Sequence, residues 1–251
     1  MAERGAVLEV DGVRRAFGGV RAVDGVSFAL QRGEIRALIG PNGAGKSTFF
    51  NILTGQLRAD AGDVRWRGRS IVGLAPHAIW RLGISRTFQI TATFATLSVL
   101  ENVQVARLSH VRRSGALVVP AAGLEVAPSR ALLDLVGLAD DVARPAGVLA
   151  YGDLKKLELA IALANDPALL LLDEPTAGMA PGERGALMAL TARIARERGL
   201  TVLFTEHDMD VVFAVAERIM VLHQGRVIAD GAPDAVRANR EVQAVYLGEA
   251  P

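Results

Sequence analysis

Apolar positions along this chain alternate with polar ones in some segments and recur at helical spacing in others. Val7 to Phe17 and Val20 to Leu30 have the length and residue types of strands, and Gly18-Gly19 between them predicts a hairpin. Further short runs, mostly apolar, predict strands at residues 34–39, 169–173, 201–205, 218–223 and 227–229. Helical spacing predicts helices from Lys46 towards Gly55 and over residues 98–108, 129–138 and 182–198.

Because strands and helices alternate, we expect an α/β protein with a parallel sheet. The alternation is interrupted between residues 91 and 160, where strand signals thin out and helical spacing dominates. Within that stretch, residues 111–128 are rich in Gly, Ala, Val and Pro and predict an irregular excursion. The pattern has no internal repeat and no obvious linker, which indicates one domain with a helical insertion.

Composition narrows the function classes. The chain has 251 residues, 51% of them hydrophobic, and a formal net charge of +1, which argues against disorder and gives no broad electrostatic case for nucleic acid. It contains no cysteine, so disulfides, thiolate catalysis and cysteine-ligated metals are excluded. The four histidines, which lack metal-ligand spacing, are His77, His110, His207 and His223.

No apolar run reaches the roughly 18–20 residues that a membrane-spanning helix needs. The longest candidate, residues 159–172, is interrupted by Asn165, Asp166 and Pro167. The first five residues lack the charged-then-apolar layout of a signal peptide. We therefore expect a soluble, intracellular chain that associates with a membrane only through a partner.

A glycine-rich run between a predicted strand and a predicted helix matches the phosphate-binding pattern G-x-x-x-x-G-K-[ST]. It reads Gly40-Pro41-Asn42-Gly43-Ala44-Gly45-Lys46-Ser47. Glycines let successive backbone N–H groups converge on phosphate oxygens, and the helix N-terminus adds its positive dipole end. We expect Lys46, one of three lysines beside 25 arginines, to reach the β- and γ-phosphates, and the Ser47 hydroxyl to bind Mg²⁺.

Two acids, Asp173 and Glu174, directly follow the apolar strand predicted at residues 169–173. In open α/β sheets ligands bind at the carboxyl ends of strands, so both carboxylates are expected beside the phosphate loop. We expect Asp173 to hold Mg²⁺, directly or through water, and Glu174 to orient or deprotonate the attacking water.

These motifs, with others in the same order, make the chain resemble the nucleotide-binding subunit of an ATP-binding-cassette (ABC) transporter over nearly its whole length. Gln89, in Arg86-Thr87-Phe88-Gln89, matches the family's Q-loop glutamine, which senses Mg²⁺ and nucleotide. His207, in Thr205-Glu206-His207-Asp208, matches the switch histidine that contacts the γ-phosphate. Phe17 lies where the family has an aromatic residue that stacks on adenine; taken alone, it is also compatible with a core aromatic.

Leu149-Ala150-Tyr151-Gly152-Asp153 lies at the position of the family's signature, Leu-Ser-Gly-Gly-Gln, which closes over the γ-phosphate of the opposite subunit. Because Ala150 has no hydroxyl, contacts would come from backbone N–H groups, including that of Gly152. Asp153 adds negative charge near a phosphate, unless it faces away or pairs with Lys155 or Lys156. A further departure is Ala180, where the family usually has an aspartate.

Within the family, the chain is most similar to the LivG-like ATPase subunits of branched-chain amino acid importers. That subgroup shares the segment Ser85 to Gln89, the Leu-Ala-Tyr-Gly form of the signature, and the tail Tyr246-Leu247-Gly248-Glu249-Ala250. The resemblance implies a P-loop NTPase (RecA-like) core with an antiparallel β subdomain, in residues 1–90 and 161–251. It also implies that the inserted helical subdomain spans residues 91–160.

The resemblance further implies an ATPase with ATP and Mg²⁺ as its ligands, in which Thr48 completes the phosphate-binding stretch. The implied catalytic set is Lys46, Gln89, Glu174 and His207, and the implied metal set is Ser47, Gln89 and Asp173. The implied partners are a second ABC ATPase subunit (homo- or heterodimer), two transmembrane permeases and, indirectly, a periplasmic or extracytoplasmic substrate-binding protein. They place the chain at the cytoplasmic face of the bacterial inner membrane, with no nucleic acid bound.

Three alternative functions are weighed against amino-acid import. A non-transport ABC ATPase for DNA repair or translation usually has two cassettes or a long coiled-coil insertion, and this chain has neither. An ordinary P-loop kinase or GTPase leaves Gln89, the signature segment and His207 unexplained. The third, an ATPase of a lipid or lipopolysaccharide exporter, stays open, because an ATPase subunit does not touch the transported molecule.

Overall fold

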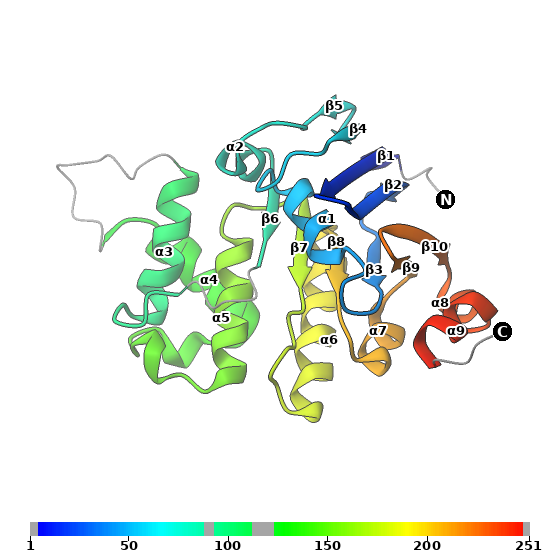
Figure 1. Ribbon diagram of the computed structural model, residues 1–251. Coiled ribbons are helices and arrows are strands. Elements are labelled where there is room, and N and C mark those ends of the chain that lie inside the picture. The colour runs from blue at the N-terminus through cyan, green and yellow to red at the C-terminus, as the bar shows by residue number, and fades with distance from the viewer. Residues whose placement is uncertain (1–4, 88–92, 112–122, 248–251) are drawn as a thin grey trace.

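Two sheets and a group of helices make up the molecule (Figure 1). The computed structural model describes residues 5–87, 93–111 and 123–247. The helices of residues 99–163 lie beside one edge of the larger sheet, and the C-terminal helices lie beyond its other edge (Figure 1). This layout matches the core, β subdomain and helical region that the sequence predicts.

The smaller sheet is antiparallel, with the strand order β2-β1-β4-β5. β1 (Ala6–Phe17) and β2 (Val20–Gln31) form the predicted hairpin. β4 (Ala61–Trp66) pairs with β1, and β5 (Arg69–Ser70) pairs with β4. The sequence analysis did not predict β4 and β5, because they are short and only Val64 and Trp66 of them are buried.

The larger sheet has the strand order β10-β9-β3-β8-β7-β6. Its strands are β3 (Ile35–Ile39), β6 (Ile84–Arg86), β7 (Leu169–Asp173), β8 (Thr201–Thr205), β9 (Arg218–His223) and β10 (Arg226–Gly231). All neighbouring pairs are parallel except β9 and β10, which form a hairpin. Every residue of the central strands β3, β7 and β8 is buried, as expected for a sheet covered on both faces.

Helices follow most strands. They are α1 (Lys46–Leu53), α2 (Pro76–Arg81), α3 (Val99–His110), α4 (Val126–Val136), α5 (Tyr151–Leu163), α6 (Pro181–Arg198), α7 (Met209–Val215), α8 (Pro233–Arg237) and α9 (Arg240–Leu247), with 3-10 turns at Ala139–Asp141 and Ala146–Val148. α1 ends just before Gly55, whose φ of 72° is the left-handed conformation of a helix stop. The sequence analysis predicted α1, α3, α4 and α6, whereas α2, α5, α7, α8 and α9 went unpredicted.

The predicted irregular stretch at residues 111–128 is wrong at its C-terminal end, because α4 begins at Val126. Pro128 is the third residue of this helix. The N–H groups of the first turn have no acceptor within the helix, so a proline there removes no intrahelical hydrogen bond. Residues 112–122 of the stretch lie outside the described part of the chain.

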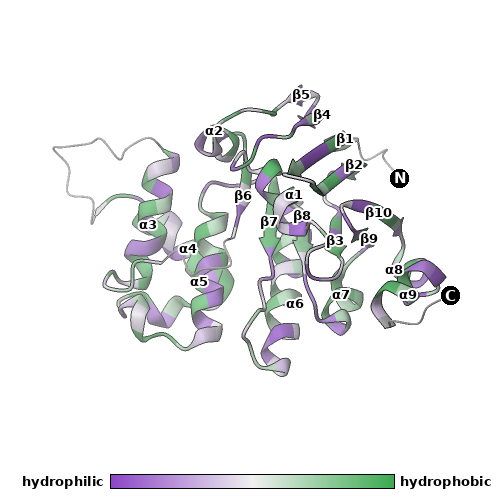
Figure 2. Cartoon of the chain, in the orientation of Figure 1, coloured by the Kyte–Doolittle hydropathy of each residue, from purple (hydrophilic) through white to green (hydrophobic). Residues whose placement is uncertain are grey.

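Alternating residues of the central strands serve two cores. Leu169 and Leu171 face the core that contains α1 and the smaller sheet, whereas Leu170 and Leu172 face the core shared with α3 to α7. Hydrophobic residues accordingly follow the central strands, and polar residues recur on the outer helices (Figure 2). The buried sheet therefore holds the carboxyl ends of its strands in fixed positions.

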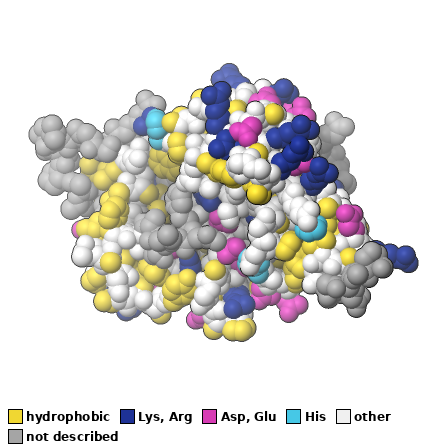
Figure 3. All heavy atoms as spheres, in the orientation of Figure 1, with side chains coloured by type: hydrophobic (Ala, Val, Ile, Leu, Met, Phe, Trp, Pro, Cys, Tyr) yellow, Lys and Arg dark blue, Asp and Glu magenta, His cyan; other side chains and the backbone are white. Residues whose placement is uncertain are grey.

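The surface is divided by residue type. Lys and Arg side chains gather over the smaller sheet, where Arg14 and Arg21 are well exposed, while hydrophobic side chains show over the helical region (Figure 3). Among the described residues, none of the helices combines the length and apolar character that a membrane crossing needs.

Candidate functional site

The phosphate loop, the two acids and the segment before His207 lie at the carboxyl ends of β3, β7 and β8. The other described site residues lie elsewhere: Phe17 ends β1, and Ala150, Tyr151 and Gly152 stand at the start of α5. β7 pairs with β8 so that Asp173 lies opposite Thr205, and β3 pairs with β8 on its other side. The phosphate loop leaves the end of β3 and leads into α1, as the sequence predicts. Sheet topology thus brings the loop, the two acids and the segment before His207 to one edge.

Backbone conformation adapts the phosphate loop to its neighbours. Gly43 and Gly45 have φ angles of 79° and 105°, which L side chains rarely adopt. At Gly45 a Cβ atom would lie 2.0 Å from the carbonyl oxygen of Ala22, so only glycine lets the loop approach β2 this closely. The loop is further held by the Gly225 amide, which donates to the Ala44 carbonyl at 2.9 Å.

The start of α1 presents unpaired backbone donors. Amides in the first turn of a helix have no carbonyl four residues earlier to bind, so those of Lys46, Ser47 and Thr48 can bind an anion. The buried Lys46 ammonium donates to the carbonyls of Gly40 at 2.6 Å and Pro41 at 3.2 Å. Burial lowers the pKa of Lys46, while the carboxylates of Glu174 and Asp173 act in the opposite direction. The loop and helix start therefore form an anion nest with a cation at its side.

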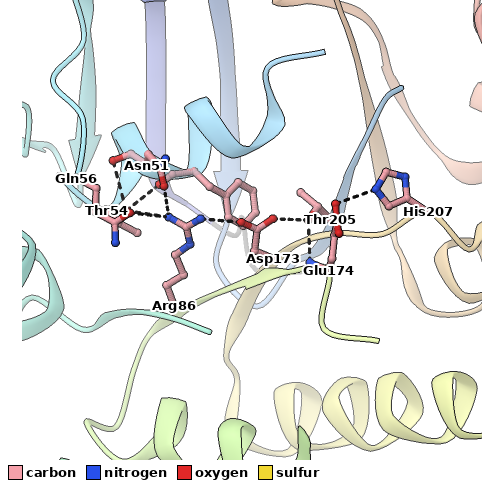
Figure 4. A network of polar contacts seen from close by, with 9 residues as sticks. Asn51, Thr54, Gln56, Arg86, Asp173, Glu174, Thr205 and His207 are labelled. Carbon is pink, nitrogen blue, oxygen red and sulfur yellow. Dashed lines mark hydrogen bonds and ion pairs between the residues drawn. The ribbon is translucent and has the colours of Figure 1, made fainter. Parts of the chain in front are cut away.

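Asp173 is buried, with 3% of its side chain exposed, and both of its oxygens are engaged (Figure 4). The Thr205 hydroxyl donates to Oδ1 at 2.9 Å, and the Arg86 guanidinium donates to Oδ2 at 2.6 Å. Arg86 also donates to Asn51 Oδ1 at 2.6 Å and lies 3.3 Å from the Thr54 hydroxyl. The sequence analysis quoted Arg86 within a motif but gave it no role.

The donor chemistry fits a magnesium ion. The Asp173 carboxylate and the exposed Ser47 hydroxyl are hard oxygen ligands of the kind that Mg²⁺ prefers. Within the described residues, no group of three or more His or acidic side chains is arranged to hold a metal. An ion at Asp173 would therefore take further ligands from water or from phosphate oxygens, as Mg²⁺ does in nucleotide sites.

Glu174 and His207 form a direct pair, with the His207 Nε2 2.8 Å from Glu174 Oε1 (Figure 4). Glu174 has a φ of 49°, and its amide donates to the Thr205 hydroxyl at 3.0 Å. This left-handed turn directs Glu174 away from the Asp173 position, so the two neighbouring acids have different partners. His207 is half exposed and can meet a ligand from outside.

Phe17 is not a core aromatic, because 46% of it is exposed. The Arg15 guanidinium lies 4.9 Å from the centre of its ring. Asp60 holds this arrangement by accepting from the Ala16 amide at 2.8 Å and from Arg15. These two hydrogen bonds, of which the one from the Ala16 amide has the larger effect, hold the pKa of Asp60 below its usual value. One position on the ring is thus taken by Arg15, and a planar group can stack only where Arg15 leaves the ring free.

The signature segment forms the start of α5. Ala150 precedes the first helical residue and makes no side-chain cap hydrogen bond, so the amides of the first turn stay available. Asp153 pairs with Lys156 at 2.8 Å, whereas Lys155 pairs with Glu158 at 3.0 Å. Of the two lysines that the sequence offered, Lys156 is therefore the one that offsets the Asp153 charge. Gln89, the remaining predicted site residue, lies outside the described residues.

Comparison with known proteins gives concordant matches. Residues 23–177 match the family model "ABC transporter", and residues 226–251 match "Branched-chain amino acid ATP-binding cassette transporter". The branched-chain amino acid transport ATP-binding protein BraF of Pseudomonas aeruginosa is 40% identical, and LivG of Salmonella typhimurium is 41% identical. Each alignment covers 97% of this chain and 98% of the relative.

Solved structures agree. A nucleotide-free ATP-binding cassette from an ABC transporter superimposes with a TM-score of 0.86 at 30% identity, covering 98% of this chain and 100% of the other. The ADP conformation of an ATP-binding cassette of an ABC transporter gives a TM-score of 0.87 at 30% identity, with the same coverage.

The close approach at Gly45 can be tested against Gly43, which has a similar positive φ but no atom within 4 Å of the point where a Cβ would lie. Gly43→Ala should carry only the cost of its backbone conformation, about 1–2 kcal/mol. Gly45→Ala adds the clash with Ala22 and should lower the free energy of unfolding by a further ~1–3 kcal/mol. Urea denaturation of both variants measures the difference, and equal losses would contradict the packing argument.

Proposed function

Because this chain belongs to the ABC transporter family, among the ATP-binding proteins of the branched-chain amino acid type, we propose that it hydrolyses ATP to drive amino-acid import. The transported molecules would be branched-chain or other hydrophobic amino acids. Two observations support this assignment together: full-length likeness to relatives named for that transport, and a separate match of residues 226–251 to the branched-chain family model. The paired Glu174 and His207 beside the phosphate loop support hydrolysis.

In the proposed binding mode, the triphosphate lies on the loop from Gly40 to Thr48. The first-turn amides of α1 would bind its oxygens, and the Lys46 ammonium would leave the loop carbonyls for the β- and γ-phosphates. Mg²⁺, held by Ser47, Asp173 and Gln89, would neutralise developing phosphate charge. Adenine would stack on Phe17, on the part of the ring that Arg15 leaves free.

For hydrolysis, Glu174 would accept a proton from the attacking water, or orient that water in line with the γ-phosphate. The 2.8 Å contact with His207 would hold the Glu174 carboxylate in place, and the same histidine would contact the γ-phosphate. Gln89 would complete the set by sensing metal and nucleotide. Asp173 is kept out of this proton transfer by its own partners, Thr205 and Arg86.

The site would be completed by a second ABC ATPase subunit, identical or related. Its signature segment would bind the γ-phosphate through backbone amides at the start of α5, those of Ala150, Tyr151 and Gly152. The ion pair with Lys156 offsets the negative charge of Asp153, which would otherwise repel the phosphate. Closure of such a dimer around two ATP molecules, and opening after hydrolysis, would supply the motion for transport.

Two transmembrane permeases would receive that motion, which places the chain at the cytoplasmic face of the bacterial inner membrane. A mostly apolar groove of about 380 Å³, termed here the α2–α5 groove, lies between the core and the helical region. Its walls include Ile79 and Trp80 of α2, Ala106 of α3 and Ile161 of α5. Because the groove also reaches Arg86 and Thr87, just before Gln89, a permease segment seated there would be near the nucleotide site. A substrate-binding protein would act on the permeases from the other side.

Glu174→Gln tests the proposed base. The amide keeps the size of the side chain but accepts protons poorly, so ATP turnover should fall about 10²–10⁴-fold. ATP affinity, measured by equilibrium binding of a fluorescent ATP analogue, should stay within about twofold of the unmodified protein. Unimpaired turnover would remove Glu174 from this role.

Phe17→Ala tests adenine stacking. An aromatic stack contributes about 0.5–1.5 kcal/mol, so ATP affinity should fall roughly 2- to 12-fold. Phe17→Tyr keeps the ring and should bind ATP normally. As a second control, inorganic tripolyphosphate has no base and should bind all three proteins equally; unchanged ATP affinity in Phe17→Ala would exclude stacking.

Transport itself can be measured in proteoliposomes that contain this chain with its co-purifying permeases. Radiolabelled leucine should accumulate when ATP is supplied on the ATPase side and a substrate-binding protein on the other. Lys46→Ala, which removes the phosphate-binding cation, should reduce uptake to background. ATP-dependent lipid release without leucine uptake would instead favour the exporter alternative.

A further inference from the structure

Arg86 joins three parts of the molecule through one guanidinium group (Figure 4). It leaves the end of β6 and contacts Asp173 at the end of β7 at 2.6 Å. On its other side it donates to Asn51 Oδ1 of α1, with its Cζ 5.6 Å from the centre of the Phe50 ring. Only 9% of the Arg86 side chain is exposed, so this is a buried ion pair rather than a surface contact.

A buried carboxylate at this position needs a cation. An ionised group removed from water is strongly destabilised unless a partner charge or hydrogen bonds replace the lost hydration. The Thr205 hydroxyl supplies one hydrogen bond to Asp173, and Arg86 supplies the positive charge. In the proposed function, Mg²⁺ would supply a positive charge to the same carboxylate when nucleotide binds.

We infer that Arg86 is an internal counter-cation that holds Asp173 in the nucleotide-free protein and makes metal binding there depend on nucleotide. Without nucleotide, a divalent cation at Asp173 faces the adjacent Arg86 charge and lacks phosphate ligands. With nucleotide, the phosphate oxygens add ligands and negative charge, and the carboxylate shifts its interaction from Arg86 towards the metal. Arg86 is a positioning residue in this scheme, and the inference rests on the proposed placement of Mg²⁺ at Asp173.

The same side chain also reaches the α2–α5 groove, because Arg86 lines it together with Thr54 and Gln56. Gln56 Oε1 lies 3.4 Å from the Arg86 guanidinium, and Thr54 Oγ1 lies 3.3 Å from it. If the Arg86 guanidinium moves when its ion pair with Asp173 weakens, its contacts with these groove residues would change as well. One arginine thus connects the metal carboxylate with the surface proposed to meet the permease.

The experiment uses Mn²⁺ as the metal probe on the full-length, nucleotide-free protein, with free Mn²⁺ followed by electron paramagnetic resonance. Arg86→Gln keeps a hydrogen-bond donor but removes the charge, so Mn²⁺ should bind at least tenfold more tightly than to the unmodified protein. Adding Asp173→Asn should cancel that gain. Arg107→Gln is the matched control, because Arg107 is also mostly buried and pairs with acids away from the site, Glu125 and Asp166; it should leave Mn²⁺ affinity unchanged.

A second measurement separates this role from a purely structural one. Arg86→Gln should lower the thermal unfolding midpoint of the nucleotide-free protein, and the loss should shrink when Mg²⁺ and a non-hydrolysable ATP analogue are bound. A residue that only ties β6 to α1 would cause the same loss in both states. Equal losses, or Mn²⁺ affinity no higher in Arg86→Gln, would overturn the inference.

If Arg86→Gln does not fold, NMR spectroscopy of the unmodified protein labelled with ¹⁵N-arginine still tests the inference. The Arg86 Nε–H signal, assigned by its absence in Arg86→Lys, should shift when Mg²⁺ joins bound nucleotide but not when EDTA is present. An unchanged signal would overturn the inference. Failure of the protein to bind Mg²⁺–ATP at all would refute the proposed function instead, and the Mn²⁺ comparison, which uses no nucleotide, would still test Arg86.

Discussion

The pairing of β7 with β8 is the constraint on which the site depends. Because Asp173 lies opposite Thr205, the Thr205 hydroxyl can serve two neighbours: it donates to the Asp173 carboxylate and accepts from the Glu174 amide. That amide bond accompanies the left-handed turn at Glu174, which sends consecutive acids to different partners. One strand register therefore separates a carboxylate paired with Arg86 from a neighbouring carboxylate paired with His207.

The sequence predicts features that a contiguous stretch of residues determines, and it misses features that depend on contacts between distant residues. The phosphate loop, α1 and the strand before Asp173 are encoded by contiguous motifs, and the structure confirms each of them. The Arg86–Asp173 pair joins residues 87 positions apart, so no spacing rule could reveal it. β5 and β6 have two and three residues, too few for a periodic signal, and they exist because neighbouring strands pair with them.

For the signature segment, the sequence identified the relevant residues but not which of them pair. The sequence identified Asp153 as a difficulty and offered Lys155 and Lys156 as partners, without the means to choose. Because α5 was not predicted, helical spacing could not be applied; on the helix, Lys156 lies three residues after Asp153 and faces it, whereas Lys155 lies only two residues after it. Lys155 lies three residues before Glu158 instead and is buried against it.

The hydrogen bond from the Gly225 amide to the Ala44 carbonyl ties the glycine loop to a turn from a distant part of the chain. The glycine loop lies between β3 and α1, whereas the turn that supports it lies between β9 and β10. The Gly225 carbonyl also accepts from the Asp24 amide at 2.8 Å, so the same turn contacts β2 as well. Local opening of the β9–β10 hairpin would therefore loosen the glycine loop and β2 together, although both are far from it along the chain.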